Sequence, residues 1–267
     1  MSNRNKDLIL TAFWITLALL FCIGVYFSMG YEPAVNFLTG YLVEKSLSVD
    51  NLFIFLLIFK AFQIPKQYRH KILFWGIFGA VVMRALFIFA GLALISYFDW
   101  VFYLFGLFLL YAGYKIFLQT DQEIHPEKNP LVLWFQKWLH VTHSMEGGRF
   151  FIRRNATPLF LALVAIETSD IIFALDSIPA IFGITTDPFI VLSSNLFAIL
   201  GLRSLYFVLE STLDTFKYLH YGLSAVLVFI GTKMLLHSVV EISPLFSLGV
   251  ILLCLTLSIL PSLTKNK

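Results

Sequence analysis

The sequence predicts an all-α membrane protein that crosses the bilayer about eight times and contains a three-plus-three inverted repeat. Three observations predict this fold class. First, 59% of the 267 residues are hydrophobic and only 13% are charged, whereas a soluble domain carries about 25% charged residues. Second, the chain contains a succession of apolar stretches long enough to span a bilayer. Third, a set of charged residues recurs at matching spacings along the chain. The composition alone excludes an ordinary soluble enzyme.

Charge and cysteine content exclude further classes of protein. Cys22 and Cys254 lie in apolar stretches near opposite ends of the chain, which argues against a disulfide framework or a zinc site. The net charge of +3 does not indicate nucleic-acid binding, because the basic residues are sorted by loop. We therefore expect neither an enzyme nor a nucleic-acid-binding protein, and no bound cofactor.

Eight stretches meet the length of a transmembrane helix, which is about 20 predominantly apolar residues. In chain order, these spans are residues 8–27, 35–59, 72–95, 100–118, 159–184, 189–209, 219–236 and 245–260. The first span is too long for a secretory signal peptide and lacks a small-residue cleavage site after it.

Lys and Arg concentrate in alternate loops, and this bias sets the orientation of membrane proteins. Basic residues precede span 1, follow spans 2, 4 and 6, and end the chain. The intervening loops, around Glu32, Asp99, Asp187 and Glu241, are acidic. The sequence therefore predicts that both termini lie in the cytoplasm.

The largest predicted soluble segment is the cytoplasmic loop at residues 119–157. Trp134, Phe135, Trp138 and Leu139 recur there at helical spacing, which predicts an amphipathic helix at the membrane interface. The loop also contains histidines and acids, namely His125, His140, His143, Asp121, Glu123, Glu127 and Glu146. Metal sensing by these residues is an alternative that we favour less than the interfacial helix.

An internal repeat relates spans 2–4 to spans 5–7. Its landmarks are an aspartate, an arginine and a lysine, at Asp50, Arg84 and Lys115 in the first copy and at Asp170, Arg203 and Lys233 in the second. The aspartate-to-arginine separations are 34 and 33 residues, and the arginine-to-lysine separations are 31 and 30. Because the copies are offset by three crossings, they have opposite orientations, as in many secondary transporters. Chance similarity among Leu- and Phe-rich helices is the alternative.

The repeat divides the chain into five predicted segments. They are an N-terminal transmembrane helix at 1–34, a first three-helix repeat at 35–118, the cytoplasmic loop at 119–157, a second three-helix repeat at 158–236, and a C-terminal transmembrane helix and tail at 237–267. Spans 1 and 8 then lie outside the repeated core.

Ionisable residues within the spans indicate a functional site, because each costs roughly 2.5–3.5 kcal/mol to insert into a bilayer. Spans 2 and 5 hold five acids, which are Glu44, Asp50, Glu167, Asp170 and Asp176. Three basic residues within spans, Lys45, Arg84 and Arg203, leave a formal excess of two negative charges. A divalent cation would balance this excess. Oxygen donors without thiolates suit Mn²⁺, Mg²⁺ or Ca²⁺ better than Cu⁺ or Zn²⁺.

Helical spacing predicts that several oxygen donors of span 2 lie together. Glu44, Ser48 and Asn51 follow i, i+4 and i+7 spacing and share one face of the helix. Asp50 lies about 120° away from Glu44 around the same helix, at about 100° per residue. The face of Glu44 is therefore the predicted site face of span 2.

Span 5 supplies the second half of the predicted site. Glu167 and Asp170 are one turn apart on neighbouring faces. Pro179 follows Asp176 and Ser177, and it should bend or break the helix because proline lacks an N–H donor. Carbonyl groups that are freed near such a break can coordinate a cation.

A purely structural reading remains open for some of these residues. Arg84 and Arg203 could neutralise Asp50 and Asp170 to hold the two halves together, and we favour this role for the arginines. Two arginines cannot neutralise five acids, so we expect the acids to form an ion path. Lys45 could pair with its neighbouring acid or face a water-filled cavity, and a polar residue such as Asn195 is more often used in helix packing. The supporting residues of the site are Ser48, Ser169, Ser177, Arg84, Arg203, Asn195 and Lys45.

Four long motifs carry a resemblance to a known family. They are EKSLSVDN at residues 44–51, FWG at 74–76 followed by Met83 and Arg84, DIIFALDSIPA at 170–180, and SNLFA at 194–198 followed by GLR at 201–203. These motifs resemble the signatures of the TerC/Alx family, polytopic membrane proteins that are named for tellurium resistance and related to the LysE-type transporter superfamily. The resemblance covers nearly the whole chain.

The resemblance implies manganese export across the bacterial inner membrane, with tellurite resistance as an older description of the family. It also implies that acids of the two repeat helices form the metal path. In this chain the implied metal-path residues are Glu44, Asp50, Asn51, Glu167, Asp170 and Asp176. Lys45 departs from the family pattern, in which Gln usually follows the Glu, and a cation there could lower metal affinity or change the coupling.

We therefore expect export of a divalent cation, Mn²⁺ above all, through a carboxylate site between spans 2 and 5. Exchange for protons is a plausible mechanism, because clustered carboxylates repel one another and let protons and metal compete. The expected partners are the lipid bilayer, the cation and protons, while protein partners stay undefined. Alternatives are transport of Ca²⁺ or a tellurite oxyanion, or a non-transporting membrane organiser or stress-response scaffold that recruits partners through the 119–157 loop. An oxyanion would favour the arginines and leave the five acids unexplained.

Overall fold

The computed structural model describes residues 3–118, 130–138, 141–142, 145–153, 155–210, 219–240 and 242–264. Its helices are α1 (Asn3–Met29), α2 (Tyr31–Ala61), α3 (Lys66–Tyr97), α4 (Trp100–Leu118), α5 (Pro130–Trp138), α6 (Pro158–Phe182), α7 (Pro188–Leu200), α8 (Leu202–Leu209), α9 (Leu219–Leu235) and α10 (Pro244–Thr264). The other elements are η2, a short 3-10 helix (Glu146–Gly148), and the antiparallel strands β1 (Phe151–Ile152) and β2 (Asn155–Ala156). The predicted all-α fold class is confirmed.

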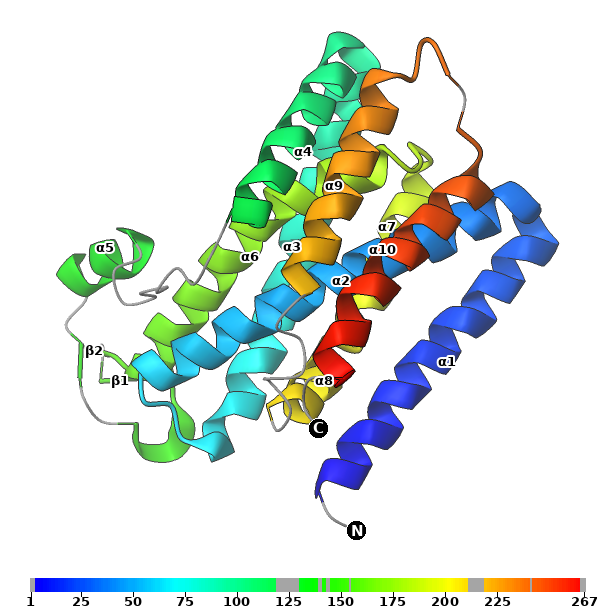
Figure 1. Ribbon diagram of the computed structural model, residues 1–267. Helices are drawn as coiled ribbons and strands as arrows, with labels where there is room; N and C mark the ends of the chain where they lie inside the picture. The colour runs from blue at the N-terminus through cyan, green and yellow to red at the C-terminus, as the bar shows by residue number, and fades with distance from the viewer. Residues whose placement is uncertain are drawn as a thin grey trace.

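The long helices form one bundle and run in alternating directions along the chain (Figure 1). Helix α2 crosses this bundle obliquely and packs against α6 and α7. The start of α1 and the end of α10 lie at the same end of the bundle. Helix α5 and the two strands lie to one side, next to the start of α6.

Several helices have the length and hydropathy of membrane spans. Within the described residues, five segments qualify, which are Asn5–Met29, Lys66–Tyr97, Trp100–Leu118, Pro158–Phe182 and Pro188–Val208. Two shorter apolar helices, α9 and α10, accompany them. Helix α2 is as long as α3, but its ionisable residues interrupt the apolar run. The chain is therefore a multi-pass membrane protein, and the count of eight spans stays a prediction.

Local sequence explains where α6 and α7 begin and end. Proline stands first in both helices, where its missing N–H costs nothing. Asp187 caps α7, since its carboxylate accepts hydrogen bonds from the Phe189 N–H at 2.8 Å and the Ile190 N–H at 3.2 Å. Of the predicted bend or break at Pro179, the break is wrong, because α6 continues to Phe182. Pro179 lies so close to the end of the helix that only the last turn has to tolerate its missing donor.

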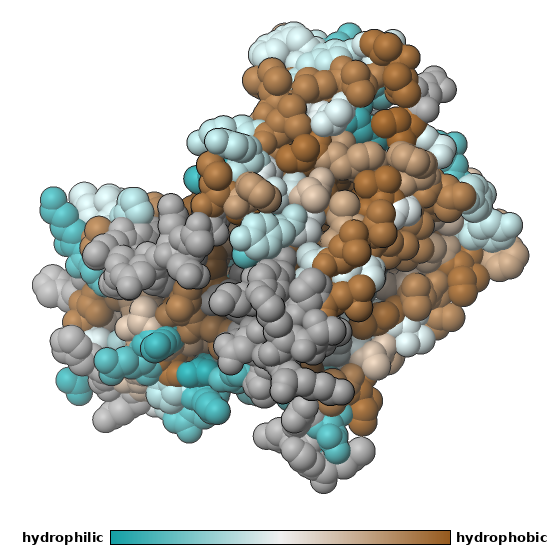
Figure 2. Space-filling view, in the orientation of Figure 1, coloured by the Kyte–Doolittle hydropathy of each residue, from teal (hydrophilic) through white to brown (hydrophobic). Residues whose placement is uncertain are grey.

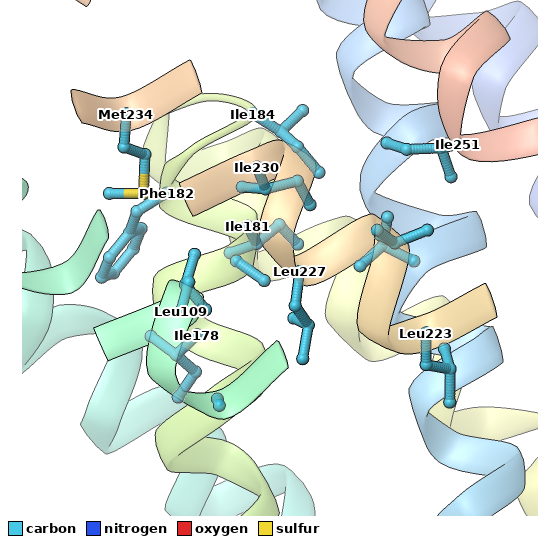
Figure 3. Close-up of a cluster of buried hydrophobic side chains, with 14 of the residues drawn as sticks. Leu109, Ile178, Ile181, Phe182, Ile184, Leu223, Leu227, Ile230, Met234 and Ile251 are labelled. Atoms are coloured by element: carbon cyan, nitrogen blue, oxygen red, sulfur yellow. The ribbon is translucent and has the colours of Figure 1, made fainter. Parts of the chain in front are cut away.

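The apolar core lies where α4, α6 and α9 meet (Figure 3). Leu109, Ile178 and Leu227 are buried in it. Small residues let α4 and α9 approach closely, as is common between membrane helices. A Cβ atom on Gly113 would lie 2.8 Å from Cγ2 of Val228, and the Ser224 hydroxyl donates a hydrogen bond to the Gly113 carbonyl at 2.6 Å. Close packing therefore fixes the positions of these two helices.

The predicted amphipathic helix of the 119–157 loop is confirmed as helix α5. It packs on α6 through Phe135, whose ring centroid lies 5.6 Å from that of Phe160, while Trp134 and Trp138 are exposed. Figure 2 shows hydrophobic side chains over much of the pictured face and strongly hydrophilic ones mainly at its margins. Leu139 and the predicted metal-sensing residues lie outside the described residues or side chains; these are His125, His140, His143, Asp121, Glu123, Glu127 and Glu146.

Candidate functional site

A cluster of charged and polar side chains lies inside the bundle where α2, α3, α6 and α7 meet. Helix α2 contributes Glu44, α3 contributes Arg84, α6 contributes Asp170 and Ser177, and α7 contributes Asn195. The three charged residues are 1%, 2% and 3% exposed, respectively. We call these five residues the Arg84 cluster. Its burial within a membrane bundle marks it as the candidate site.

The guanidinium group of Arg84 joins the four helices. Its Nη1 donates hydrogen bonds to Oε1 of Glu44, to the Ser177 hydroxyl at 3.2 Å and to Oδ1 of Asn195 at 3.1 Å. Its Nη2 donates to Oδ1 of Asp170 at 3.4 Å. One cation therefore faces two carboxylates, and the ionised cluster carries a formal charge of −1.

Several buried oxygens of this cluster and of the next two turns of α2 have no hydrogen-bond partner in the described structure. They are Oε2 of Glu44, Oδ2 of Asp170, the Ser48 hydroxyl and Oδ1 of Asn51. A buried polar atom without a partner costs about 1–3 kcal/mol, so each of these atoms would be stabilised by a further ligand. Glu44, Ser48 and Asn51, which helical spacing places on one face of α2, are each 1% exposed.

The chemistry of these donors fits a hard cation. Carboxylate, hydroxyl and amide oxygens are the ligands that Mn²⁺, Mg²⁺ and Ca²⁺ prefer. In the described ranges, no group of three or more His, Cys, Asp or Glu residues is arranged to hold a metal ion. A cation at this site would therefore draw on Ser and Asn oxygens, or on water, besides the two carboxylates.

The remaining acids of α6 lie along the same helix but not in the same hydrogen-bonded group. The Glu167 carboxylate lies against Gly79 of α3, where a side chain on Gly79 would collide with it, and the charge of Asp170 acts on it. Asp176 is half-buried and lies within reach of the charge of Lys115 on α4. From Glu167 to Asp176 the helix rises about 13 Å, and at about 100° per residue the three acids of α6 lie on different faces.

The structure describes two other predicted site residues to different extents. The Asp50 residue belongs to α2, but its side chain lies outside the described part of the structure. The Ser169 hydroxyl donates a hydrogen bond to the carbonyl of Ala165 in its own helix at 2.8 Å. Ser177, by contrast, reaches Arg84, because it lies seven residues after Asp170 and shares its face.

Arg203 does not bind Asp170, one of the two acids that the sequence suggested as partners of the two arginines. Arg203 is exposed, and its Nη2 lies 3.2 Å from Nδ1 of His70 at the start of α3. Asp170 is paired by Arg84 instead. The reason is the break between α7 and α8 at Gly201, which separates Arg203 from the helix that lines the cluster.

Lys45 does not pair with its neighbouring acid, the first of its two expected positions. Its side chain makes no ion pair with Glu44, whose Oε1 is bound by Arg84. Instead, its ammonium group donates a hydrogen bond to the carbonyl of Ala198 in α7 at 3.0 Å. Lys45 therefore connects α2 to the end of α7.

Sequence reasoning missed the role of Gly79. Gly76 and Gly79 are three residues apart on α3, and both face α6. A small-residue pair at this spacing in an apolar helix is a signal of close helix contact. That signal predicts a close approach, but it does not reveal that a carboxylate lies opposite.

Comparisons with known proteins agree with the sequence motifs. The profile of the family described as "Integral membrane protein TerC family" matches residues 29–267. The chain is 51% identical over 261 residues to the uncharacterized membrane protein STKORF319 of Myxococcus xanthus, which covers 96% of this chain and 82% of that protein. It is 47% identical over 250 residues to a protein of Escherichia coli K12 that is provisionally named membrane-bound redox modulator Alx. This match covers 89% of this chain and 78% of that protein. No solved structure matches. The chain belongs to the TerC family of integral membrane proteins.

Proposed function

We propose that this protein exports divalent metal cations, with Mn²⁺ as the preferred substrate, through the Arg84 cluster. The observation that carries the proposal is the set of unpaired oxygens on Glu44, Asp170, Ser48 and Asn51. These are hard donors in a buried position between helices, where an unsatisfied carboxylate is costly. A divalent cation is a ligand that would satisfy them.

Arg84 gives the proposed site a resting state. The guanidinium group neutralises part of the charge of Glu44 and Asp170 while no cation is bound. An arriving cation would compete with Arg84 for the same carboxylates. Protons would compete as well, since clustered carboxylates repel one another, and exchange of metal for protons follows from this competition.

The proposed three-plus-three inverted repeat supports a transporter. A Cβ atom on Gly113 would lie 3.0 Å from the Ser224 carbonyl oxygen, and one on Gly231 would lie 2.7 Å from that of Gly106. In the repeat register, Gly113 corresponds to Gly231 and Gly106 to Ser224, so a two-fold axis exchanges the two contacts. The pairs α2 with α7 and α3 with α6 exchange in the same way. Such repeats open a central site alternately to either side of a membrane.

The proposed location is the bacterial inner membrane with both termini in the cytoplasm. Relatives of this chain come from bacteria, and the start of α1 and the end of α10 lie at the same end of the bundle. A tellurite oxyanion is less well supported as substrate, because four acceptors surround the guanidinium group of Arg84.

Transport assays in proteoliposomes test this proposal. We expect the wild-type protein to move Mn²⁺, and Asp170→Asn to lower the initial rate by at least about tenfold, the lower end of the effect of altering a metal's surroundings. Asp99→Asn is the matched control, because Asp99 is an exposed acid between α3 and α4. Equal rates for wild type and Asp170→Asn would contradict the proposed site. Mn²⁺ flux that is indifferent to an imposed pH gradient would eliminate proton exchange.

A further inference from the structure

The ammonium group of Lys45 lies at the end of a broken membrane helix. Helix α7 ends at Leu200, and α8 begins at Leu202 after the break at Gly201. The Lys45 Nζ donates to the Ala198 carbonyl at 3.0 Å. It lies so close to Gly201 that a Cβ atom there would be 2.9 Å from it, and Trp14 of α1 contacts the same glycine.

The end of α7 is a place where a cation is favourable. The last four carbonyl groups of a helix have no intrahelical partner, and the helix dipole gives this end a partial negative charge. Two neighbouring carbonyls already have donors: Ile199 accepts from the Gly201 N–H, and Gly201 accepts from the Leu205 N–H at 3.1 Å. The Ala198 carbonyl differs from these two because its donor is the side chain of Lys45.

The charge of Lys45 has no carboxylate partner in the described part of the chain. Its sequence neighbour Glu44 is bound by Arg84, and none of the ion pairs of the described side chains includes Lys45. The Lys45 side chain is partly buried, and an ammonium group without a carboxylate is costly in a membrane. The helix end must therefore compensate it, as the ends of broken helices do for monovalent cations in transporters.

We propose that the end of α7 forms a monovalent-cation site and that Lys45 fills it as a tethered ammonium ion. The ligand class is a small monovalent cation, with ammonium and K⁺ closest to the lysine head group in size. Lys45 is then a positioning residue, since its bond to α7 holds α2 and with it the adjacent Glu44. This site is separate from the Arg84 cluster and does not depend on the identity of the transported ion.

Removal of the tether should expose the site to free cations. We expect purified Lys45→Ala to unfold at a lower temperature than wild type in choline chloride, because choline is too large to enter. Exchange of choline for ammonium or K⁺ at constant ionic strength should raise the Tm of Lys45→Ala saturably by roughly 3 °C or more. The wild-type Tm should be the same in all of these salts.

Two variants are matched controls for this experiment. Lys45→Met keeps a long side chain in the space but carries no charge, so it should be destabilised and should gain nothing from ammonium. Lys60→Ala removes an exposed lysine from the same helix and should behave as wild type. If Lys45→Ala unfolds during purification in choline, purification in ammonium chloride followed by dilution into choline measures the same binding.

The result that would overturn the inference is equally direct. The site does not exist if Lys45→Ala has the same Tm in choline and ammonium, or if Lys60→Ala shows the same cation dependence. These measurements use unfolding rather than transport. A failure of Mn²⁺ export would therefore leave this inference standing, and its own failure would leave the Arg84 cluster untouched.

Discussion

Two arginines of α3 bind carboxylates of other helices, and they do so in different surroundings. Arg84, in the middle of α3, binds Glu44 and Asp170, and the side chains of all three are at most 4% exposed. Arg69, near the start of α3, binds Glu210 just after α8, and these side chains are 16% and 21% exposed. The same pair of chemical groups is thus buried at one level of α3 and partly hydrated at another.

The two arginines also differ in how completely their groups are paired. Arg69 donates from Nε to the Ile64 carbonyl at 3.1 Å and from Nη1 to the Tyr206 hydroxyl at 3.5 Å, and it lies over the ring of Phe59. The Arg84 cluster retains an unpaired oxygen on each carboxylate and an unpaired Nε. The comparison indicates that the Arg69 contact is a structural contact between helices, while the Arg84 cluster has unpaired groups that a ligand could bind.

Loss of the buried arginine should have the largest effect. Arg84→Leu leaves the charges of Glu44 and Asp170 buried without a cation, and we expect the free energy of unfolding to fall by about 3–5 kcal/mol. Arg69→Leu, the matched variant on the same helix, should cost about 1 kcal/mol. Thermal unfolding in detergent measures both, and equal losses would show that burial does not distinguish the two sites.

Metal addition sharpens the same comparison. If a cation and Arg84 compete for the carboxylates, Mn²⁺ should raise the Tm of Arg84→Leu by more than it raises that of the wild type, because only bound ligand stabilises the folded state. The Tm of Arg69→Leu should respond to Mn²⁺ as the wild type does. A response that is the same in all three proteins would place Mn²⁺ binding elsewhere.

The close contact between α3 and α6 should give the next largest effect. A methyl group on Gly79 would collide with the Glu167 carboxylate, whereas one on Gly76 would lie 2.9 Å from Cγ2 of Ile166. We expect Gly79→Ala and Gly76→Ala each to lower the free energy of unfolding by about 1–3 kcal/mol.

The shorter side chain of Glu167→Asp separates the two glycines. It should recover part of the stability of Gly79→Ala, because it withdraws the carboxylate from the added methyl group, and should not recover that of Gly76→Ala. Thermal unfolding of the three single variants and of the two double variants that combine Glu167→Asp with each glycine substitution forms two double-mutant cycles. Rescue of both glycine variants, or of neither, would mean that Gly79 does not serve the carboxylate specifically.

The sequence could predict the helices and one face of the site, because both depend on local spacing. The shared face of Glu44, Ser48 and Asn51 follows from helix geometry alone, and all three are buried. The excess of acids within the predicted spans likewise indicated that α2 and α6 carry the candidate site, without any knowledge of helix packing. Apolar length predicted α3, α4 and α6 for the same reason.

The pairing of charges could not be predicted, because it depends on how whole helices rotate and break. Arg84 binds Glu44, a partner that the repeat register did not suggest, since the orientation of α2 against α3 is set by packing. Arg203 lies outside the site because the chain breaks at Gly201, which no proline marks. Lys45 binds a backbone carbonyl of α7, and backbone acceptors leave no signal in a sequence.

The smallest expected effect concerns the partly exposed ion pair. Glu210→Gln removes the charge that faces Arg69 and should lower the free energy of unfolding by about 0.2–1 kcal/mol. Because water and salt reach this pair, the loss should shrink as the salt concentration rises from about 0.01 M to 1 M. Glu32→Gln, which alters an exposed acid at the start of α2, is the control for general charge effects on the measured Tm. A loss of stability for Glu210→Gln that is large and independent of salt would show that Arg69 and Glu210 are shielded from solvent as strongly as the Arg84 cluster. The two arginine sites would then differ only in the unpaired oxygens of Glu44 and Asp170.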